Sequence, residues 1–502
     1  MIMIFRRRFL TSFLTGLLTS ACVFAQDPVA TTVPGPAAVT TAPELTLEQC
    51  ITRALQKNFS LEMGRFNPQI AKDGIDVAGA GYEPTVLVSG NHGRNVYGAT
   101  SLTNSSALTS SDLRAGVSQK LYSGTTVSAT SQLDRNAQNP AISSINPAYN
   151  ADLTLEVRQS LLSGFGTTVN KAIINRAKIG LARANLDYKA QALDVIYSTE
   201  NAYYNLAFAR EQLTVRNLSL ALANRLYDES KTRRDTGVAT NLDVLQAEVG
   251  VANARRNVLL AGQEVKDRQD ALLALIGQFE LNSDVGAVHL AAIDNVLPVF
   301  ASSYQLAKQN QPDFLSEQAA IDQLKLDVVA AKDATKPDLS VGLAVGLNGN
   351  RSSVDAALGD AFNRQNNSWQ VDFAFRYPWG QVSNKARYRQ SQSTLGREET
   401  FLRQLEQNIE VNVRSAVRSV ETNNESVKIA ALSSDLSLKQ YELEKDRFDA
   451  GLSTSYRVLQ AQNDLDTARV EELLAKVSYH AAVAALHRLE GSSLQHYGVS
   501  LP

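Results

Sequence analysis

The C-terminal third of this chain repeats an earlier stretch at a constant offset of 214 residues. The recurring residues are Tyr227, Lys231, Arg233, Asp235, Gly237, Thr240 and Val244–Ala247 in the first copy, and Tyr441, Lys445, Arg447, Asp449, Gly451, Thr454 and Val458–Ala461 in the second. The register holds without a gap as far as Gly277 and Gly491. Such a repeat predicts one structural unit built twice, each copy a helix, a tight turn and a second helix. We therefore expect function to reside in something two-fold repetitive, such as a bundle, a wall or a channel.

The first 25 residues have the pattern of a secretory signal peptide. Arg6–Arg8 form a basic start, an apolar run follows from Phe9, and Val23, Phe24 and Ala25 offer an A-x-A-like cleavage site before Gln26. Two alternatives remain: the arginines also resemble a twin-arginine export signal, and the sequence ending at Cys22 resembles a lipoprotein box with its leucine one position early. Residues 26–43 carry four prolines among Ala, Thr and Val, which predicts a disordered leader.

Composition limits the classes of protein to which the mature chain can belong. Cleavage after Ala25 leaves Cys50 as the only cysteine, which excludes an intrachain disulfide. The formal net charge of the whole chain is −2 at pH 7, and nothing indicates nucleic-acid binding. After the signal, no stretch reaches the roughly 18 uninterrupted apolar residues that a membrane-spanning helix needs. If the chain crosses a membrane, we expect it to cross as strands.

Two segments of the second half alternate cleanly between large apolar and polar or small side chains. The apolar set of one strand runs Leu339, Val341, Leu343, Val345 and Leu347, and that of the other runs Trp369, Val371, Phe373, Phe375 and Tyr377. The residues between the members of the second set include Asp372 and Arg376. Alternation of this kind is typical of a barrel with lipid outside and water inside. Trp369, Val371, Phe373, Phe375 and Tyr377 are therefore predicted to face lipid.

The first half contains up to four further strand candidates, at 85–90, 113–121, 125–133 and 153–158. Polar stretches at 95–111, 137–151 and 348–367 are predicted as long outer loops. The strand number per subunit is left open between four and six. Each strand group leads into a proline-free segment, 167–236 or 381–450, of about 70 residues that would reach roughly 105 Å as a helix. Apolar residues at spacings of three, four or seven form a narrow seam in the second of these segments.

With these features the chain resembles the TolC-like outer-membrane efflux family over nearly its whole mature length. The most specific pieces are the two helix tips, Asp235, Thr236, Gly237, Val238, Ala239, Thr240 and Asp449, Ala450, Gly451, Leu452, Ser453, Thr454. Each glycine is suited to a left-handed helix end, and each threonine to capping the helix that follows. The alternative is that both tips are ordinary helix turns with no partner.

The resemblance implies an α+β membrane protein, in which an outer-membrane β-barrel shared by a homotrimer continues into a long periplasmic α-helical barrel. It implies a signal peptide (1–25), a leader (26–43), two repeats (44–290 and 291–491) and a C-terminal tail (492–502). It also implies a passive exit duct for an inner-membrane transporter, serving either efflux or type I secretion. A periplasmic adaptor protein would dock on Gly237, Val238, Ala239 and Thr240 together with Gly451, Leu452, Ser453 and Thr454.

The chain departs from the family at the expected acidic constriction after the second tip. The matching positions here are Arg457 and Gln460, whereas Asp243 after the first tip does match an acidic position. Asp243 and Arg457 are therefore a candidate gate, and a solvated helix surface is the alternative. The acidic constriction itself is not expected in this chain.

No catalytic constellation, cofactor site or metal-ligand spacing is present, so the sequence does not predict an enzyme. His480 and His487 are interpreted as helix packing. A soluble periplasmic coiled-coil scaffold, with its strands as an ordinary capping sheet, remains the rival of the exit duct.

Overall fold

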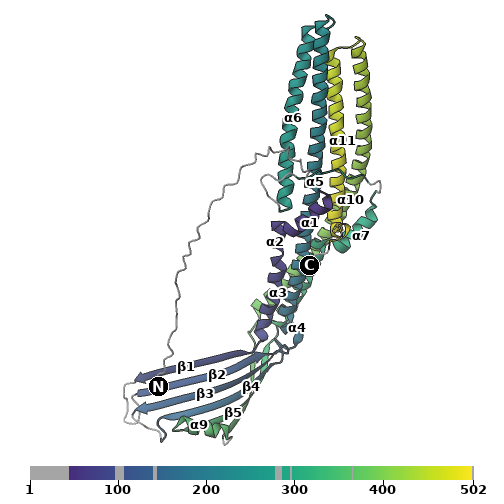
Figure 1. The fold of residues 1–502 in the computed structure, drawn as a ribbon. Helices are drawn as coiled ribbons and strands as arrows, with labels where there is room; N and C mark the ends of the chain where they lie inside the picture. The colour runs from purple at the N-terminus through teal and green to yellow at the C-terminus, as the bar shows by residue number, and fades with distance from the viewer. Residues whose placement is uncertain are drawn as a thin grey trace, which may run out of the picture. The chain divides into compact units, whose positions relative to one another are not determined.

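The computed structural model describes residues 45–96, 107–139, 144–277, 285–293, 297–363 and 366–499. The expected signal peptide, the leader and the lipid-attachment alternative at Cys22 lie outside the described residues. Within them, a six-stranded sheet lies at one end of a set of long helices, and the two helical hairpins end at the other (Figure 1).

The first half of the chain opens with short helices, passes through four strands and continues into a long helical hairpin. Its elements are α1 (Leu47–Lys57), α2 (Phe59–Gly64), α3 (Phe66–Gly79), η1 (Ala80–Tyr82), β1 (Thr85–Val96), β2 (Ala107–Lys120), β3 (Thr125–Asn139), β4 (Ala148–Ser160), α4 (Thr167–Asn170), α5 (Ala172–Asp235) and α6 (Asn241–Leu275). The side chain of Asn58 accepts hydrogen bonds from the first amide groups of α2, which separates α1 from α2.

The second half follows the same order with two strands. Its elements are α7 (Phe300–Asn310), α8 (Pro312–Asp333), β5 (Asp338–Arg351), α9 (Val354–Phe362), β6 (Asn367–Arg376), α10 (Val382–Asp449), α11 (Ser455–Glu490) and α12 (Ser493–His496). The expected boundary between the repeats, at residue 291, falls in an irregular described segment, 285–293. α12 lies in the expected C-terminal tail.

The six strands form one antiparallel meander in the order β1-β2-β3-β4-β5-β6. Because the pairing is in register throughout, apolar residues of neighbouring strands share one face, and polar residues share the other. One apolar row runs Val86, Val117, Ala129, Leu155, Val345 and Trp369 across all six strands. The adjacent row runs Thr85, Ser118, Ser128, Glu156, Ala344 and Gln370 on the opposite face. All six strand candidates of the sequence are thus strands of a single two-faced sheet.

Helix α9 lies on the apolar face at the end of the sheet far from the long helices (Figure 1). Ala357 and Ala361 are buried against Ala151 of β4. A Cβ atom at Gly349 would lie 2.0 Å from the carbonyl oxygen of Ala357, so only glycine allows this close approach.

The structure corrects the expected loops and the expected ends of several strands. The stretch 348–367, expected to be a polar loop, contains α9 and the end of β5. β1 continues to Val96 and β3 to Asn139, past the predicted ends, because backbone pairing extends beyond the apolar alternation. Residues 97–106 and 140–143 of the predicted loops lie outside the described residues.

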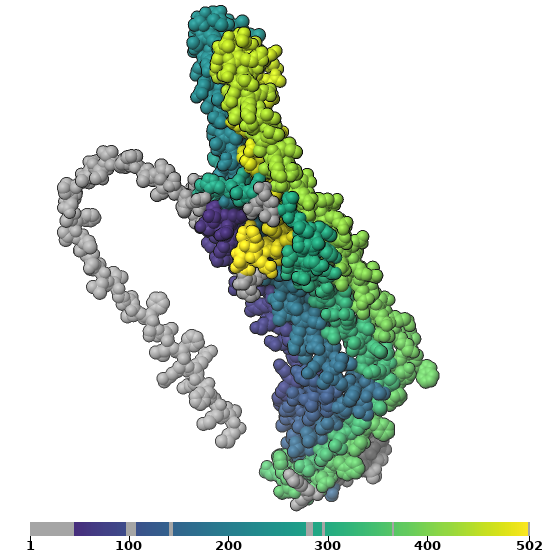
Figure 2. Space-filling view, turned by 90° about the vertical axis from the view of Figure 1, so that its right-hand side faces the viewer, coloured from purple at the N-terminus to yellow at the C-terminus, as the bar shows by residue number. Residues whose placement is uncertain are grey.

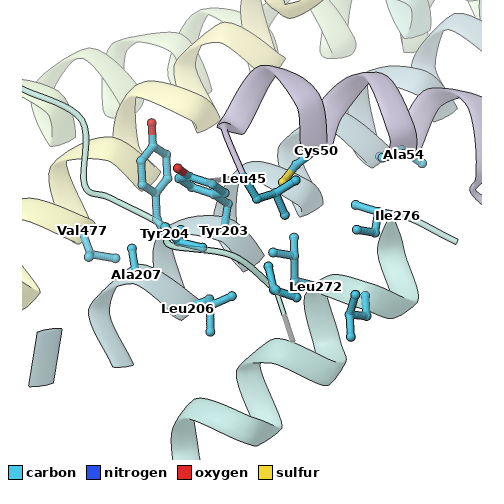
Figure 3. Packing of buried hydrophobic residues seen from close by; sticks show 14 residues of the cluster. Leu45, Cys50, Ala54, Tyr203, Tyr204, Leu206, Ala207, Leu272, Ile276 and Val477 are labelled. Atoms are coloured by element: carbon cyan, nitrogen blue, oxygen red, sulfur yellow. The ribbon is translucent and has the colours of Figure 1, made fainter. Parts of the chain in front are cut away.

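The long helices pack side by side up to the tips (Figure 2). In α10 the seam is Ile409, Val413, Val417, Val420 and Val427, which is buried against α7, α8 and α11. Near α1, Leu45 and Cys50 pack with Tyr203, Leu272 and Ile276 (Figure 3). This cluster joins the opening helix of the first half to its helical hairpin.

Each returning helix ends on a glycine that contacts the end of an opening helix. Gly277, after α6, has φ +67°, and a Cβ there would lie 2.3 Å from the carbonyl oxygen of Lys57 at the end of α1. Gly491, after α11, has φ +68°, and its Cβ would lie 2.8 Å from the carbonyl oxygen of Asn310 at the end of α7. We call these two contacts the glycine junctions.

Candidate functional site

The two tips share one backbone conformation. In the first, Gly237 has φ +79°, and the Val238 amide donates to the carbonyl oxygen of Arg233 at 2.8 Å. In the second, Gly451 has φ +77°, and the Leu452 amide makes the equivalent bond to Arg447 at 2.8 Å. These bonds satisfy the last carbonyl groups of α5 and α10, as in a Schellman motif. The predicted left-handed helix ends are confirmed at both glycines.

The turns expose two apolar side chains at equivalent places. Val238 and Leu452 are each 73% exposed. The remaining expected tip residues, Ala239 and Ser453, are partly exposed, and Thr240 and Thr454 are exposed. The two turns therefore present one exposed apolar side chain each, at equivalent positions of the repeat.

The predicted threonine caps differ between the tips. Thr240 forms a capping box, because its hydroxyl accepts from the Asp243 amide at 3.3 Å while its own amide donates to the Asp243 carboxylate at 2.9 Å. Thr454 occupies the N-cap of α11 but makes no side-chain cap bond, so its predicted capping bond is wrong. Arg457 stands where a capping box needs a carboxylate, and the hydroxyl of Ser453 donates instead to Glu444.

A set of contacts between the hairpins holds the two tips together. The Arg233 guanidinium donates to the carbonyl oxygen of Phe448 at 2.7 Å and lies 4.1 Å from the centre of its ring. Lys445 pairs with Glu229 at 2.8 Å. These partners lie 215 and 216 residues apart in sequence, so no local pattern predicts them. They fix Gly237 and Gly451 at neighbouring hairpin ends.

The candidate gate residues occupy different environments. Asp243 accepts from Thr240 and also from the hydroxyl of Ser455 at 3.2 Å, across the hairpins. The Thr240 hydrogen bonds are the main reason that the pKa of Asp243 lies below its usual value. Arg457 is exposed. In the described part of one subunit, no ion pair joins Arg457 to Asp243.

The predicted lipid-facing residues lie on the apolar face of β6 and are exposed in the described part of one subunit. Trp369, Val371, Phe373 and Phe375 are all exposed, and Phe373 is 80% exposed. Tyr377 follows the strand directly. On the opposite face, Arg158 donates to Asp372 at 2.9 Å and to Glu156 at 2.9 Å. One face of this sheet therefore suits lipid and the other suits water.

The sequence analysis missed a buried polar cluster beside α1. Glu200 is 3% exposed and accepts a hydrogen bond from the Tyr497 hydroxyl. Burial raises the pKa of Glu200 to about 7, and the bond from Tyr497 lowers it less. His480 stacks on Tyr204 with ring centres 4.5 Å apart, which agrees with its interpretation as helix packing. The signal for this cluster is an isolated glutamate in an apolar stretch of α5.

Within the described residues, no group of three or more histidine, cysteine, aspartate or glutamate side chains is arranged to hold a metal ion. No described helix combines the length and the apolar character required to span a membrane.

Comparisons with known proteins agree with the sheet and the hairpins. The family model described as outer membrane efflux protein matches residues 146–278 and 303–492. The chain is 25% identical over 342 residues to the outer membrane efflux protein BepC of Brucella suis, covering 67% of this chain and 70% of that one. It is 24% identical over 388 residues to the pyoverdine export outer membrane protein OpmQ of Pseudomonas aeruginosa, covering 74% of each.

The fold is similar to that of the outer-membrane channel OprN, with a TM-score of 0.68 and 18% identity over 89% of this chain and 90% of that one. Since the family model matches well over half of the residues, this chain belongs to the outer membrane efflux protein family, a family of channels and not of enzymes, and is an outer-membrane exit duct of a tripartite efflux system that extends into the periplasm.

Proposed function

We propose that three copies of this chain form the duct and that its two tips dock a periplasmic adaptor protein, which connects the duct to an inner-membrane transporter. The duct passes its substrate passively, and the inner-membrane transporter supplies the energy. Small-molecule efflux is favoured over polypeptide secretion, since the relatives carry efflux and small-molecule export in their names. Membership of the family excludes the soluble scaffold that the sequence left as an alternative.

The observation that carries the docking role is the exposure of Val238 and Leu452 at equivalent turns. The side chains of Val238 and Leu452 project from turns that backbone hydrogen bonds close, so neither side chain is needed to close its turn. The interhairpin contacts of Arg233 and Lys445 hold the two side chains near each other. A paired apolar tip is suited to a groove between the helices of a partner's hairpin.

Substitution of each apolar side chain by aspartate tests this role. A carboxylate buried at the contact loses its hydration without gaining a partner, so Val238→Asp and Leu452→Asp should each abolish efflux. The matched control is Val238→Thr, which keeps the size of the side chain and should retain most activity. The measurement is the susceptibility of the producing strain to dyes and antibiotics, at outer-membrane abundance checked by immunoblotting. Normal resistance in both aspartate variants would remove the docking role.

A further inference from the structure

We propose that the hairpin β2–β3 is an insertion built into the wall of the barrel, so that each subunit supplies six strands. The barrel shared by three subunits then has eighteen strands, where the family pattern of two strands per half gives twelve. The inference rests on the proposed trimer, and it predicts an outer mouth wider than that of a twelve-stranded barrel.

The spacing of equivalent elements locates the insertion in the first half. The ends of α5 and α10 differ by 214 residues (449 − 235), but the starts of α1 and α7 differ by 253 (300 − 47). The first half therefore carries 39 additional residues (253 − 214) between its opening helix and its long helix. The β2–β3 hairpin, residues 107–139, accounts for 33 of them (139 − 107 + 1). Without it, each half contributes one pair of strands.

The hairpin lies inside the sheet and not on its surface. β2 pairs with β1 from Thr85 opposite Ser118 to Val96 opposite Ala107. β3 pairs with β4 along nearly its whole length, beginning with Thr125 opposite Gln159. A decorative hairpin would leave β1 and β4 paired with each other, whereas here two complete strands separate them.

The hairpin also continues both faces of the sheet. Val117 of β2 and Ala129 of β3 extend the apolar row, and Leu113 and Val117 are exposed in one subunit. On the other face, the Arg114 guanidinium donates to Gln132 at 2.7 Å. Strands packed outside a barrel would not need one apolar and one polar face in phase with the wall.

The turn between β2 and β3 is fixed at the junction of sheet and helices. Gly124 has φ +87°, and a Cβ atom there would lie 2.2 Å from the carbonyl oxygen of Gly164. The Gly166 amide donates to the Ser123 carbonyl at 3.1 Å, and the Lys171 ammonium lies 4.9 Å from the centre of the Tyr122 ring. The hairpin is therefore anchored to the same segment that leads from β4 into α5.

The two edges of the sheet fit a second copy of this chain. In the described part of the subunit, β1 and β6 each pair with one strand only, which leaves one row of backbone groups open on each. Because the strand number is even, β6 of one copy meets β1 of the next antiparallel, with apolar faces on the same side. At a strand spacing of about 4.8 Å and a tilt of about 40°, closure gives a backbone radius of about 18 Å, against about 12 Å for twelve strands.

Electron cryo-microscopy of the full-length protein in detergent, alone and with residues 107–139 deleted, tests the strand number. The deletion removes two whole strands and joins the segment after β1 to the segment before β4, so the alternation of the remaining strands is unchanged. We expect eighteen strands in the full chain and twelve in the deletion variant. A trimer with twelve strands and the hairpin outside the wall would overturn the inference and leave the proposed function intact. An assembly that is not a trimer would overturn both.

Thiol labelling in the intact outer membrane gives a second test that needs no deletion. Ser118→Cys should react with a charged, membrane-impermeant thiol reagent at least tenfold faster than Val117→Cys, because the two side chains point to opposite faces. Gln370→Cys and Val371→Cys on β6 are the matched reference pair. Cys50 is fully buried and adds no background. Equal labelling at 117 and 118 with a normal reference pair would overturn the inference, whereas equal labelling in both pairs would refute the lipid-facing sheet itself.

Discussion

Replacing Gly277 by alanine is expected to destabilise the helical part of the protein more than the same change at a tip. The left-handed conformation costs a residue with a Cβ atom about 1 to 2 kcal/mol. The new Cβ would also lie 2.3 Å from the Lys57 carbonyl oxygen, so α1 or the end of α6 must shift. Forced shifts of packed structure cost about 1 to 3 kcal/mol. The two costs together predict a loss of about 2 to 5 kcal/mol in the free energy of unfolding.

The matched control is Gly237→Ala. Gly237 has a similar φ of +79°, but no described heavy atom beyond its chain neighbours lies within 4 Å of the position of its Cβ. Gly237→Ala should therefore lower the free energy of unfolding only by the cost of the left-handed conformation, about 1 to 2 kcal/mol. Gly262 lies inside α6 with equally open surroundings, so Gly262→Ala should stabilise the helix by up to about 1 kcal/mol.

Urea unfolding of the detergent-solubilised protein, followed by the helical circular dichroism signal, measures these differences from the shift of the midpoint at a constant slope. Gly491→Ala should behave like Gly277→Ala, because the second glycine junction has the same φ and a similar backbone contact. If Gly277→Ala were no more destabilising than Gly237→Ala, the close approach to α1 would not be what requires glycine there.

Phe373→Arg should lower the stability of the folded barrel by roughly 2 to 4 kcal/mol, because a charged side chain would face lipid, and Ala374→Arg should lower it less. Equal loss of heat-modifiable trimer in both variants would contradict the face assignment. Burial raises the pKa of Glu200 above its value in the unfolded chain. The contribution of Glu200 to the free energy of unfolding is therefore complete below about pH 4.5 and is lost as the pH rises through about 7. In Glu200→Gln, the free energy of unfolding measured from pH 5 to 8 should decline less steeply, by at most about 3 kcal/mol over the range. The gate hypothesis pairs Arg457 with Asp243 when three subunits close the duct, and an exposed pair of this kind is worth only about 0 to 1 kcal/mol, which biases a gate without locking it. On this hypothesis Arg457→Asp replaces the attraction by repulsion between like charges and should raise single-channel conductance. Arg457→Gln should raise it less, and an equal rise would contradict a charge-based gate.

The strands and long helices were predictable because their signals are local. The alternation from Trp369 to Tyr377 and the absence of proline from 382 to 449 each specify an element without reference to the rest of the chain. Helix α9 was missed because it spans only Val354–Phe362, and its burial depends on Ala151, some 200 residues away in sequence. Local signals therefore predict the long elements, but they do not predict the distant contact that holds the short helix α9.

The tips show the same division. Gly237 and Gly451 were predictable, because a glycine after a long helix indicates a left-handed end. The absence of a capping hydrogen bond from the Thr454 side chain was not predicted, although Arg457 stands where a capping box has a carboxylate. The stacking of Arg233 on Phe448 depends on how two hairpins pack, which a sequence pattern of period 3.6 does not encode.

The glycine junctions lie at the end of each returning helix that is far from its tip. From Leu275 to Asn241, α6 has 35 residues, a rigid arm of about 52 Å. A rotation of only about 5° at the junction would displace the tip of such an arm by about 4 to 5 Å, close to the pitch of one helical turn. A small reorientation of the helices where Gly277 meets Lys57 is therefore amplified into a larger displacement of the tip at the far end.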